Sequence, residues 1–350
     1  MKLFNILFTL FGVVTVIFFL FQILPGDPAR MMMDQNEDVE QLEIIKKKYG
    51  FDEPILNQYL YYLNDLSIIS IHSKNPEKIN FIRENKYSFT KIYDFQNSTL
   101  VLKFPYLRES YQRRGVKVST IIMDTFPNTV VLAISSILFA TVFGLLLGIL
   151  SALYKETLFD NSIQLFSTFG MSMPSFLSSI IFAWIFGFVL ADITGLNMTG
   201  SLFELDDFGD EYRLELKNLI LPSIVLGIRP IAVISMMMRN SLIETLKKNY
   251  VITAYAKGLS KSKVILNHCL KNSLNPVITA LSGWFASLLA GSVFVEYIFG
   301  WNGLGREIVN SLNLLDVPVI IGAVIVVSFS FIMINIFVDY VYKFLDPRIS

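Results

Sequence analysis

The stretch that decides the fold is residues 239–276, RNSLIETLKKNYVITAYAKGLSKSKVILNHCLKNSLNP. Long apolar runs flank it on both sides. It contains seven Lys or Arg residues against one acidic residue, Glu244. Because short cytoplasmic loops of membrane proteins carry an excess of Lys and Arg, we expect this loop to face the cytoplasm.

A glycine divides the loop into two helical pieces. Tyr250 and Ala254 lie in the first piece, and Gly258 ends it. Ser260 stands where it could cap the second piece. The pattern predicts two short helices that meet at Gly258 just beneath the membrane, a shape that fits a groove on a soluble partner.

The composition is that of an integral membrane protein. Of the 350 residues, 53% are hydrophobic, and the mean hydropathy is +0.54. The apolar residues come in long blocks, which soluble domains rarely contain. The chain has one cysteine, Cys269, so it cannot form an intrachain disulfide.

Six apolar runs are long enough to span a bilayer. They cover residues 3–24, 126–153, 162–191, 219–246, 277–298 and 319–344. The first run is too long for a signal peptide, and no small-residue cleavage site follows it. Pro174 in the third run and Pro222 and Pro230 in the fourth predict kinks.

Charge places both termini in the cytoplasm. Lys155, the 239–271 segment, Lys343 and Arg348 would all lie inside. The loop over 192–217 is rich in Asp and Glu and would lie outside. We therefore expect a multi-pass membrane protein, surrounded by lipid, with both ends cytoplasmic.

Residues 26–117 contain no spanning run and predict an extracytoplasmic insertion between spans one and two. Residues 36–66 are expected to be helical, with a start at Asn36 and a second helix opened by Pro54. Residues 87–93 and 99–104 are prone to form strands. The chain thus divides into a first span (1–25), the insertion (26–117) and a five-span core (118–350) that holds the cytoplasmic loop at 246–276.

No motif for catalysis or metal binding is present. The sequence lacks G-x-x-x-x-G-K-[ST], H-E-x-x-H and G-x-S-x-G. The two histidines, His72 and His268, are predicted on opposite sides of the membrane. The run from Gly300 to Gly305 follows a span rather than a strand, which favours a tight turn over a nucleotide site. We expect no catalytic residue, no metal site and no bound cofactor, so any motor lies on another chain.

Arg229 is the residue most suggestive of a path through the membrane. It lies about ten residues, or about 15 Å, into the fourth span. A charge at that depth is costly and usually faces a cavity or a partner. In a functional role, Arg229 would line the path and meet a carboxylate or phosphate on the cargo. In a structural role, it would form a buried pair with Glu296 or with an acid of a second subunit, or its side chain would snorkel toward the outer surface. The other candidates for the path are Asn128, Ser172, Pro174 and Trp284.

Several motifs together resemble those of one family. They are Leu24-Pro25-Gly26-Asp27-Pro28, Tyr49-Gly50-Phe51-Asp52-Glu53-Pro54 with Gln58-Tyr59, Asp124-Thr125-Phe126-Pro127-Asn128-Thr129, Ser172-Met173-Pro174-Ser175-Phe176, Tyr250 to Ser260, Val295 to Gly305, and Leu345-Asp346-Pro347-Arg348. The chain resembles the membrane permease subunits of bacterial ATP-binding-cassette importers, in the dipeptide, oligopeptide and nickel branch.

The resemblance implies an all-α, six-helix permease of the type I importer fold. The chain would form half of a path for di- or oligopeptides and pair with a second homologous permease. Two ABC ATPase subunits, which hold ATP and Mg, would bind below, and an extracytoplasmic solute-binding protein would deliver cargo; no nucleic acid is involved. Residues 248–262 look like the ATPase-coupling loop, with Tyr250, Ala254, Lys257, Gly258 and Ser260 as its contact residues.

The sequence departs from the family pattern in two places. Ile252 and Thr253 replace the Glu and Ala of the general importer motif, so lysines would supply charge contacts to the ATPase. Residues 67–117 are some forty residues longer than usual and would enlarge a scaffold for the binding protein. Nickel or another metal chelate is the alternative cargo. A stand-alone secondary transporter is a more distant alternative, because it would need coupling-ion residues in the spans.

Overall fold

A computed structural model describes residues 2–23, 27–33, 39–76, 78–82, 87–206 and 209–345. The chain forms two compact units, which are described separately below. The first comprises Met1–Asp124 and Ile308–Ser328, and the second comprises Thr125–Glu307 and Phe329–Ser350. The predicted helical start at Asn36, Leu24 to Gly26 of the first motif, and Asp346 to Arg348 of the last lie outside the described residues.

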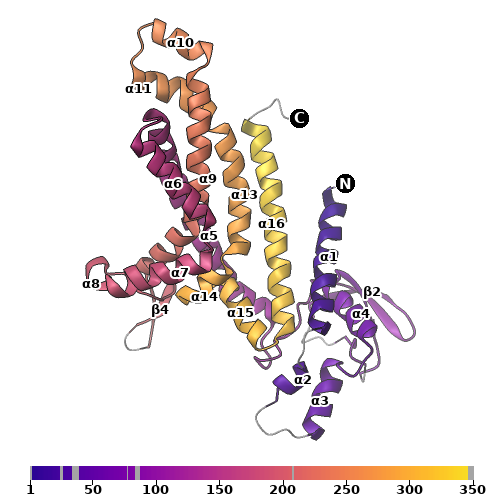
Figure 1. Cartoon of the computed structure of the whole chain (residues 1–350). Coiled ribbons are helices and arrows are strands. Elements are labelled where there is room, and N and C mark those ends of the chain that lie inside the picture. The colour runs from indigo at the N-terminus through magenta and orange to yellow at the C-terminus, as the bar shows by residue number, and fades with distance from the viewer. Residues whose placement is uncertain are drawn as a thin grey trace. The chain divides into compact units, whose positions relative to one another are not determined.

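The first unit combines a spanning helix with the insertion (Figure 1). Its elements are α1 (Lys2–Ile23), α2 (Pro28–Met31), α3 (Val39–Tyr49), α4 (Ile55–Leu66), β1 (Ile69–Ser73), β2 (Phe89–Asp94) and β3 (Ser98–Lys103). With 22 residues, α1 is about 33 Å long, enough to cross the hydrocarbon core. The insertion therefore contains the predicted helices and the two predicted strands.

One strand of this unit, β1, was not predicted from the sequence. The sheet has the order β1-β3-β2 and is antiparallel throughout. β1 pairs Ile69 with Leu102 and Ile71 with Leu100. Within β1 the isoleucines are exposed while Ser70 and His72 are buried, so the strand shows the period of two that sheets require.

A polar cluster fixes the sheet to the end of α4. The carboxylate of Asp65 accepts hydrogen bonds from Tyr87 Oη at 2.9 Å and from Arg108 Nε at 2.8 Å. Lys103 Nζ donates to the backbone carbonyls of Asp65 and Ser67. Burial lowers the pKa of Lys103. The sheet is thus part of the folded body of the first unit, and the charges of this cluster are bonded within it.

The second unit is almost entirely helical. Its elements are the main part of α5 (Val118–Leu153), α6 (Leu158–Ser172), α7 (Ser175–Trp184) with a π-helical turn (Ile185–Val189), α8 (Ala191–Thr194), β4 (Phe203–Leu205), β5 (Tyr212–Leu214), a 3-10 turn (Leu216–Leu219), α9 (Ile220–Leu246), α10 (Asn249–Ala256), α11 (Lys261–Val264) with a second π-helical turn (Ile265–Cys269), α12 (Leu270–Ser273), α13 (Asn275–Gly291), α14 (Val293–Phe299), the start of α15 (Leu304–Asn313) and the end of α16 (Val317–Leu345).

Among the described residues, four helices are long and apolar enough to cross a membrane, or up to six spans if each of two bent pairs counts as one. The six-span architecture is the fold expected from the sequence. The third span is broken rather than kinked: α6 and α7 meet at 109°, because Met173 adopts an extended conformation and Pro174 has no N–H to continue the ladder. The fourth span runs as one helix through Pro230.

Two other spans have boundaries that differ from the prediction. α5 begins at Val118 rather than at residue 126, because Val118, Ile121 and Ile122 are buried and extend its apolar pattern. The fifth span ends at Gly291, and a separate helix, α14, follows Ser292. Sequence hydropathy does not detect such breaks because both sides of each break are apolar.

Small residues let α9 pack closely against α5. A Cβ added at Gly144 would lie 2.7 Å from Ile234 Cγ2, and one at Gly148 would lie 2.6 Å from the carbonyl oxygen of Ser235. Both distances are too short for real carbon atoms, so only glycine allows this approach. α9 is therefore the central helix of the second unit, as its position between α6 and α13 in Figure 1 shows.

Candidate functional site

The predicted cytoplasmic loop forms two short helices that meet at a glycine. α9 ends at Leu246 and α10 starts at Asn249. Gly258 follows α10 with φ at +81°, and its N–H donates to the carbonyl of Tyr255 at 2.9 Å. The left-handed conformation favours glycine, so Gly258 ends the helix as the sequence predicted.

The helix pair α10–α11 has its own small core. Val251 and Ala254 of α10 and Val264 of α11 are buried in one cluster, which continues into α9 through Leu242. Ser260 stands at the N-cap position of α11, but its side chain makes no capping hydrogen bond. Ser260 therefore occupies the predicted N-cap position, but the predicted capping hydrogen bond is not formed. The helix pair is thus joined to α9 by a shared buried core.

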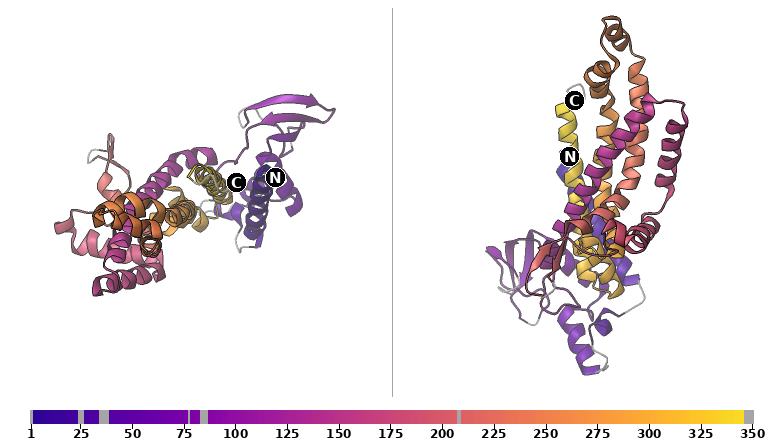
Figure 2. Two further views of the ribbon diagram at one scale, coloured as in Figure 1. Left: turned by 90° about the horizontal axis from the view of Figure 1, so that it is seen from above. Right: turned by 90° about the vertical axis from the view of Figure 1, so that its left-hand side faces the viewer.

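The outer surface of α10 is apolar and exposed. Tyr250, Ile252 and Tyr255 all face solvent, and Ala254 lies on the buried side. Lys257 at the end of the helix is exposed as well. Ile252 occupies a place where the importer motif has Glu, so the exposed surface offers apolar contact with lysines beside it. Figure 2 shows α10 and α11 beyond the ends of the long helices of the second unit.

A buried ion pair fastens α9 to the start of α6. Arg239 Nε and Nη2 donate to the two carboxylate oxygens of Asp160 at 2.7 and 2.6 Å. The Asp160 side chain is 0% exposed and that of Arg239 is 15% exposed. Ser151 Oγ and Gln164 Nε2 also donate to Asp160. The bidentate geometry is the strongest form of this contact, and the sequence analysis did not identify it.

A second arginine fastens α9 to the other end of α6. Arg229 Nε and Nη2 donate to the carbonyl oxygen of Met173 at 3.3 and 3.1 Å. Met173 is the C-cap of α6, where carbonyl groups lack helical partners and a cation is favoured. Between the two arginines, Ser235 Oγ lies 3.0 Å from Ser167 Oγ. α6 is thus held against α9 at both ends and in the middle.

A cavity of about 60 Å³ lies at the bend of the third span. Arg229 of α9 and Trp284 of α13 line it, together with Met173 and Ser175 on either side of Pro174. Ser172 is next to this bend, and its hydroxyl donates to the carbonyl of Thr168. The structure therefore brings four of the five predicted path residues to one region of the second unit.

Asn128 does not belong to that region. Its side chain donates to the carbonyl of Asn302 at 2.7 Å, and its own carbonyl accepts from Trp301 Nε1. The alternative in which Arg229 pairs with Glu296 is not the arrangement in this structure, because Arg229 donates to Met173. Glu296 is fully buried and accepts from the N–H of Gly305 at 2.6 Å, where it satisfies the start of α15. The run from Gly300 to Gly305 is the predicted tight turn.

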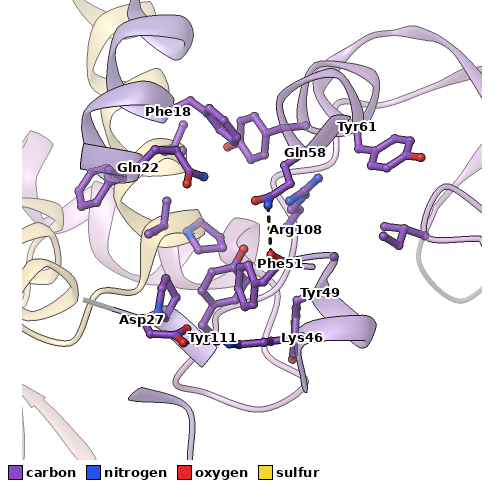
Figure 3. A pocket seen from close by; sticks show the side chains of 18 residues that line it. Phe18, Gln22, Asp27, Lys46, Tyr49, Phe51, Gln58, Tyr61, Arg108 and Tyr111 are labelled. Atoms are coloured by element: carbon purple, nitrogen blue, oxygen red, sulfur yellow. Dashed lines mark hydrogen bonds and ion pairs between the residues drawn. The ribbon is translucent and has the colours of Figure 1, made fainter. Parts of the chain in front are cut away.

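The first unit contains a larger cavity, of about 290 Å³. Figure 3 shows Gln58, Arg108 and Tyr111 around it. Its charged groups already have partners: Lys46 Nζ lies 3.3 Å from Asp27, and Arg108 is bonded to Asp65. The ring of Tyr62 lies 4.8 Å from the Arg108 guanidinium. We assign this cavity a structural role. Across the described residues, no group of three or more His, Cys, Asp or Glu side chains is placed to hold a metal.

This architecture defines a polytopic membrane protein: spans, two of them bent, pack around a central helix that continues into an exposed helix pair. Comparison with known proteins specifies the class. Residues 144–350 match the family described as binding-protein-dependent transport system inner membrane component. Residues 1–81 match the family of N-terminal segments of such membrane components. The chain belongs to the family of inner membrane components of binding-protein-dependent transport systems.

Individual relatives agree with this assignment. The di/tripeptide transport system permease protein DppB of Pseudomonas aeruginosa (strain UCBPP-PA14) is 32% identical, over 97% of this chain and 95% of the relative. The glutathione transport system permease protein GsiC of Escherichia coli (strain K12) is 30% identical, over 99% and 97%. A chain of the inward-facing MetNI methionine ABC transporter shares the fold, with a TM-score of 0.53 and 14% identity over 65% of this chain and 97% of that chain. The resemblance to importer permeases is confirmed, and the chain is a multi-pass inner membrane permease subunit.

Proposed function

We propose that this chain is the transmembrane subunit of an ATP-driven importer for short peptides and forms half of the path with a second, homologous permease. The observation that carries the proposal is the helix pair α10–α11, which extends α9 by a shared core and exposes an apolar surface. The peptide cargo is inferred from relatives named for di/tripeptide, dipeptide and glutathione transport.

The proposed assembly divides the work among several chains. Two ATPase subunits with ATP and Mg bind below the permease pair, on the side that also holds both termini. One of them contacts this chain at Tyr250, Ala254, Lys257, Gly258 and Ser260. A solute-binding protein delivers cargo on the opposite side, near the 26–117 insertion. The chain itself carries no catalytic group and no cofactor. The division into residues 1–25, 26–117 and 118–350, with the coupling loop at 246–276, follows from the same assignment.

The proposed mechanism is alternating access. ATP binding draws the ATPase subunits together and moves α10, and α9 carries that movement into the membrane. Arg239 and Arg229 then transmit it to both ends of α6, so the bend at Met173 and Pro174 changes position with α9. By linkage, the loaded binding protein must favour the same state that ATP favours.

The docking proposal predicts that Ala254→Trp separates the ATPase subunits from the complex. Ala254 is 6% exposed, so an indole at this position forces α10 away from α11 and alters the docking surface. The measurement is the amount of ATPase subunit that co-purifies with tagged chain from native membrane in mild detergent. Arg114→Trp is the control, because Arg114 is exposed in the insertion and the change places the same indole far from the loop in sequence.

Co-purification at the wild-type level with Ala254→Trp would contradict the docking proposal. Isolation of the wild-type chain alone, or only with copies of itself, would contradict the importer assignment as a whole. Loss of the ATPase with both tryptophan variants would indicate general misfolding, and the milder Ala254→Leu would then be compared with Arg114→Leu.

A separate prediction concerns Arg229. We expect Arg229→Ala to reduce peptide uptake and to weaken the apparent affinity for cargo, since the guanidinium lines the cavity at the bend and retains donors besides those bonded to Met173. Arg229→Lys should retain part of the uptake. The measurement is the concentration dependence of uptake into proteoliposomes that contain the whole complex. An alanine variant with unchanged affinity would show that Arg229 acts only on the α6 terminus.

A further inference from the structure

Helix α4 lies at membrane depth even though it belongs to the insertion. The hydroxyls of Thr15 on α1 and Tyr59 on α4 are 2.6 Å apart. Thr15 precedes the end of α1 at Ile23 by eight residues, or about 12 Å along the helix. α4 also packs on Ile321, near the start of spanning helix α16. Two spanning helices therefore place Tyr59 inside the apolar layer.

The side of α4 that faces away from these helices is apolar. Leu56 is 63% exposed and Leu60 is 52% exposed. They are four residues apart, so they lie on one stripe of the helix. Leu56 and Leu60 lie on a helix that packs against the spanning helix α1. Contact with lipid chains stabilises such exposed leucines, whereas contact with water does not.

One face of the β1-β3-β2 sheet is apolar in the same way. Ile69, Ile71 and Leu102 are exposed, and the pairing of Ile69 with Leu102 and of Ile71 with Leu100 places these side chains on one face. Tyr93 pairs with Leu100 and joins that face. The outward face therefore carries no charge along these pairs.

The lysines of the sheet lie on its other face. Lys91 pairs with Val101, whose side chain is buried on that other face. Lys103 Nζ donates a hydrogen bond to the carbonyl of Asp65 at the end of α4. A sheet with both faces exposed to water would carry charged side chains on both faces. The separation of charges from aliphatic residues indicates that the outward face contacts an apolar medium.

The apolar stripe of α4 and the apolar face of the sheet form one surface. The Asn64 side chain bonds both the N–H and the carbonyl of Ile71 at 3.0 Å, so the edge of β1 runs along α4 at Asn64. Leu60 lies one turn before Asn64 on one side of this junction. Asp65, which bonds Tyr87 beneath the sheet, lies on the other side. The outward face of the sheet is therefore on the Leu60 side.

We propose that this surface rests in the lipid leaflet at the Ile23 end of α1, which is the outer leaflet in the proposed orientation. Acyl chains cover the aliphatic residues, and the aromatic residues lie among the lipid headgroups, where such side chains are favoured. The surface, here called the leaflet face, consists of Leu56, Leu60, Ile69, Ile71, Tyr93, Leu102 and Phe104. Phe19 of α1 is 38% exposed, and its ring lies 5.2 Å from that of Tyr59 on α4, so the occupant is the lipid that already surrounds α1.

The test uses a fluorophore attached to single cysteines in a Cys269→Ala background. The sites are Leu102 on the leaflet face and, as the matched control, Lys91 on the opposite face of the same sheet. The labelled chain is purified with its partner subunits and reconstituted into phosphatidylethanolamine–phosphatidylglycerol vesicles. Quenching by lipid that carries a nitroxide on its acyl chain is compared with quenching by aqueous iodide.

We expect lipid nitroxide to quench the Leu102 label and iodide to quench it several-fold less than the Lys91 label. A label at Ile71 should behave like the one at Leu102, and it replaces Leu102 if that variant does not assemble. Equal iodide quenching at Leu102 and Lys91, without quenching by lipid, would overturn the proposal. So would a Leu102 label that loses iodide quenching only when loaded binding protein is added, because the face would then dock a protein.

Discussion

Arg239→Ala is expected to destabilise the chain by about 3 kcal/mol and to abolish transport. The substitution leaves the fully buried Asp160 without its cation, and removal of one partner of a buried pair typically costs about 3–5 kcal/mol. Ser151, Gln164 and the N–H of Glu156 still donate to the carboxylate, which places the loss at the low end of that range. The measurement is the thermal unfolding midpoint of the purified complex in mild detergent, followed by uptake in proteoliposomes.

The chain offers a control for this prediction just after the end of α9. Lys248 lies 3.8 Å from Glu244, and their side chains are 49% and 78% exposed. Exposed pairs of this kind contribute less than about 1 kcal/mol, so Lys248→Ala should leave the unfolding midpoint nearly unchanged. The double variant Asp160→Asn/Arg239→Met should recover part of the stability, because no unpaired charge remains buried. Equal midpoints for Arg239→Ala and Lys248→Ala would contradict the role given to the buried pair.

Gly303→Val is expected to destabilise the second unit by about 3 kcal/mol, the upper end of the usual cost of overpacking. A Cβ at Gly303 would overlap the Glu296 carboxylate and lie 2.7 Å from Thr129 Oγ1. Glu296 would have to move, and the N–H groups of Gly305 and Arg306 at the start of α15 would lose their acceptor. The thermal unfolding midpoint of the detergent-solubilised complex measures the effect.

Gly283 of α13 supplies the control for Gly303. No atom lies within 4 Å of a Cβ added there, and alanine is the better helix former by up to about 1 kcal/mol. Gly283→Ala should therefore leave the midpoint unchanged or raise it slightly. A Gly303→Val complex as stable as the Gly283→Ala complex would show that the turn tolerates a side chain and that Glu296 is not fixed.

The local features of this chain could be predicted because they follow from local physical chemistry. Gly258 was identified because a left-handed residue that ends a helix favours glycine, and the structure gives it φ at +81°. The spans were found because 18 or more apolar residues in a row have few stable alternatives to a membrane. The tight turn at Gly300 was favoured because it follows a span, and the buried Glu296 explains why the turn has its particular sequence.

The long-range contacts could not be predicted because no local pattern specifies them. Asp160 and Arg239 are 79 residues apart, and only the close approach of α9 to α6 brings them together. The 109° bend depends on the partner of the Met173 carbonyl as well as on Pro174. β1 was overlooked although Ile69 to His72 alternate, because the run is short and follows α4 directly. Asn128 was grouped with the path because its position near the start of a span does not reveal its acceptor.

The two edges of the insertion sheet also bear on how the chain avoids aggregation before assembly. Unpaired edge strands are templates for pairing with other chains, and an apolar sheet face increases that risk. The β1 edge is bonded to Asn64 of the same chain. The β2 edge carries Lys91 and an irregular register between Lys91 and Tyr93, and a charge and a bulge both oppose addition of a further strand. A chain whose sheet has folded before its partner subunits bind is therefore protected from edge-to-edge pairing with the same sheet of another copy.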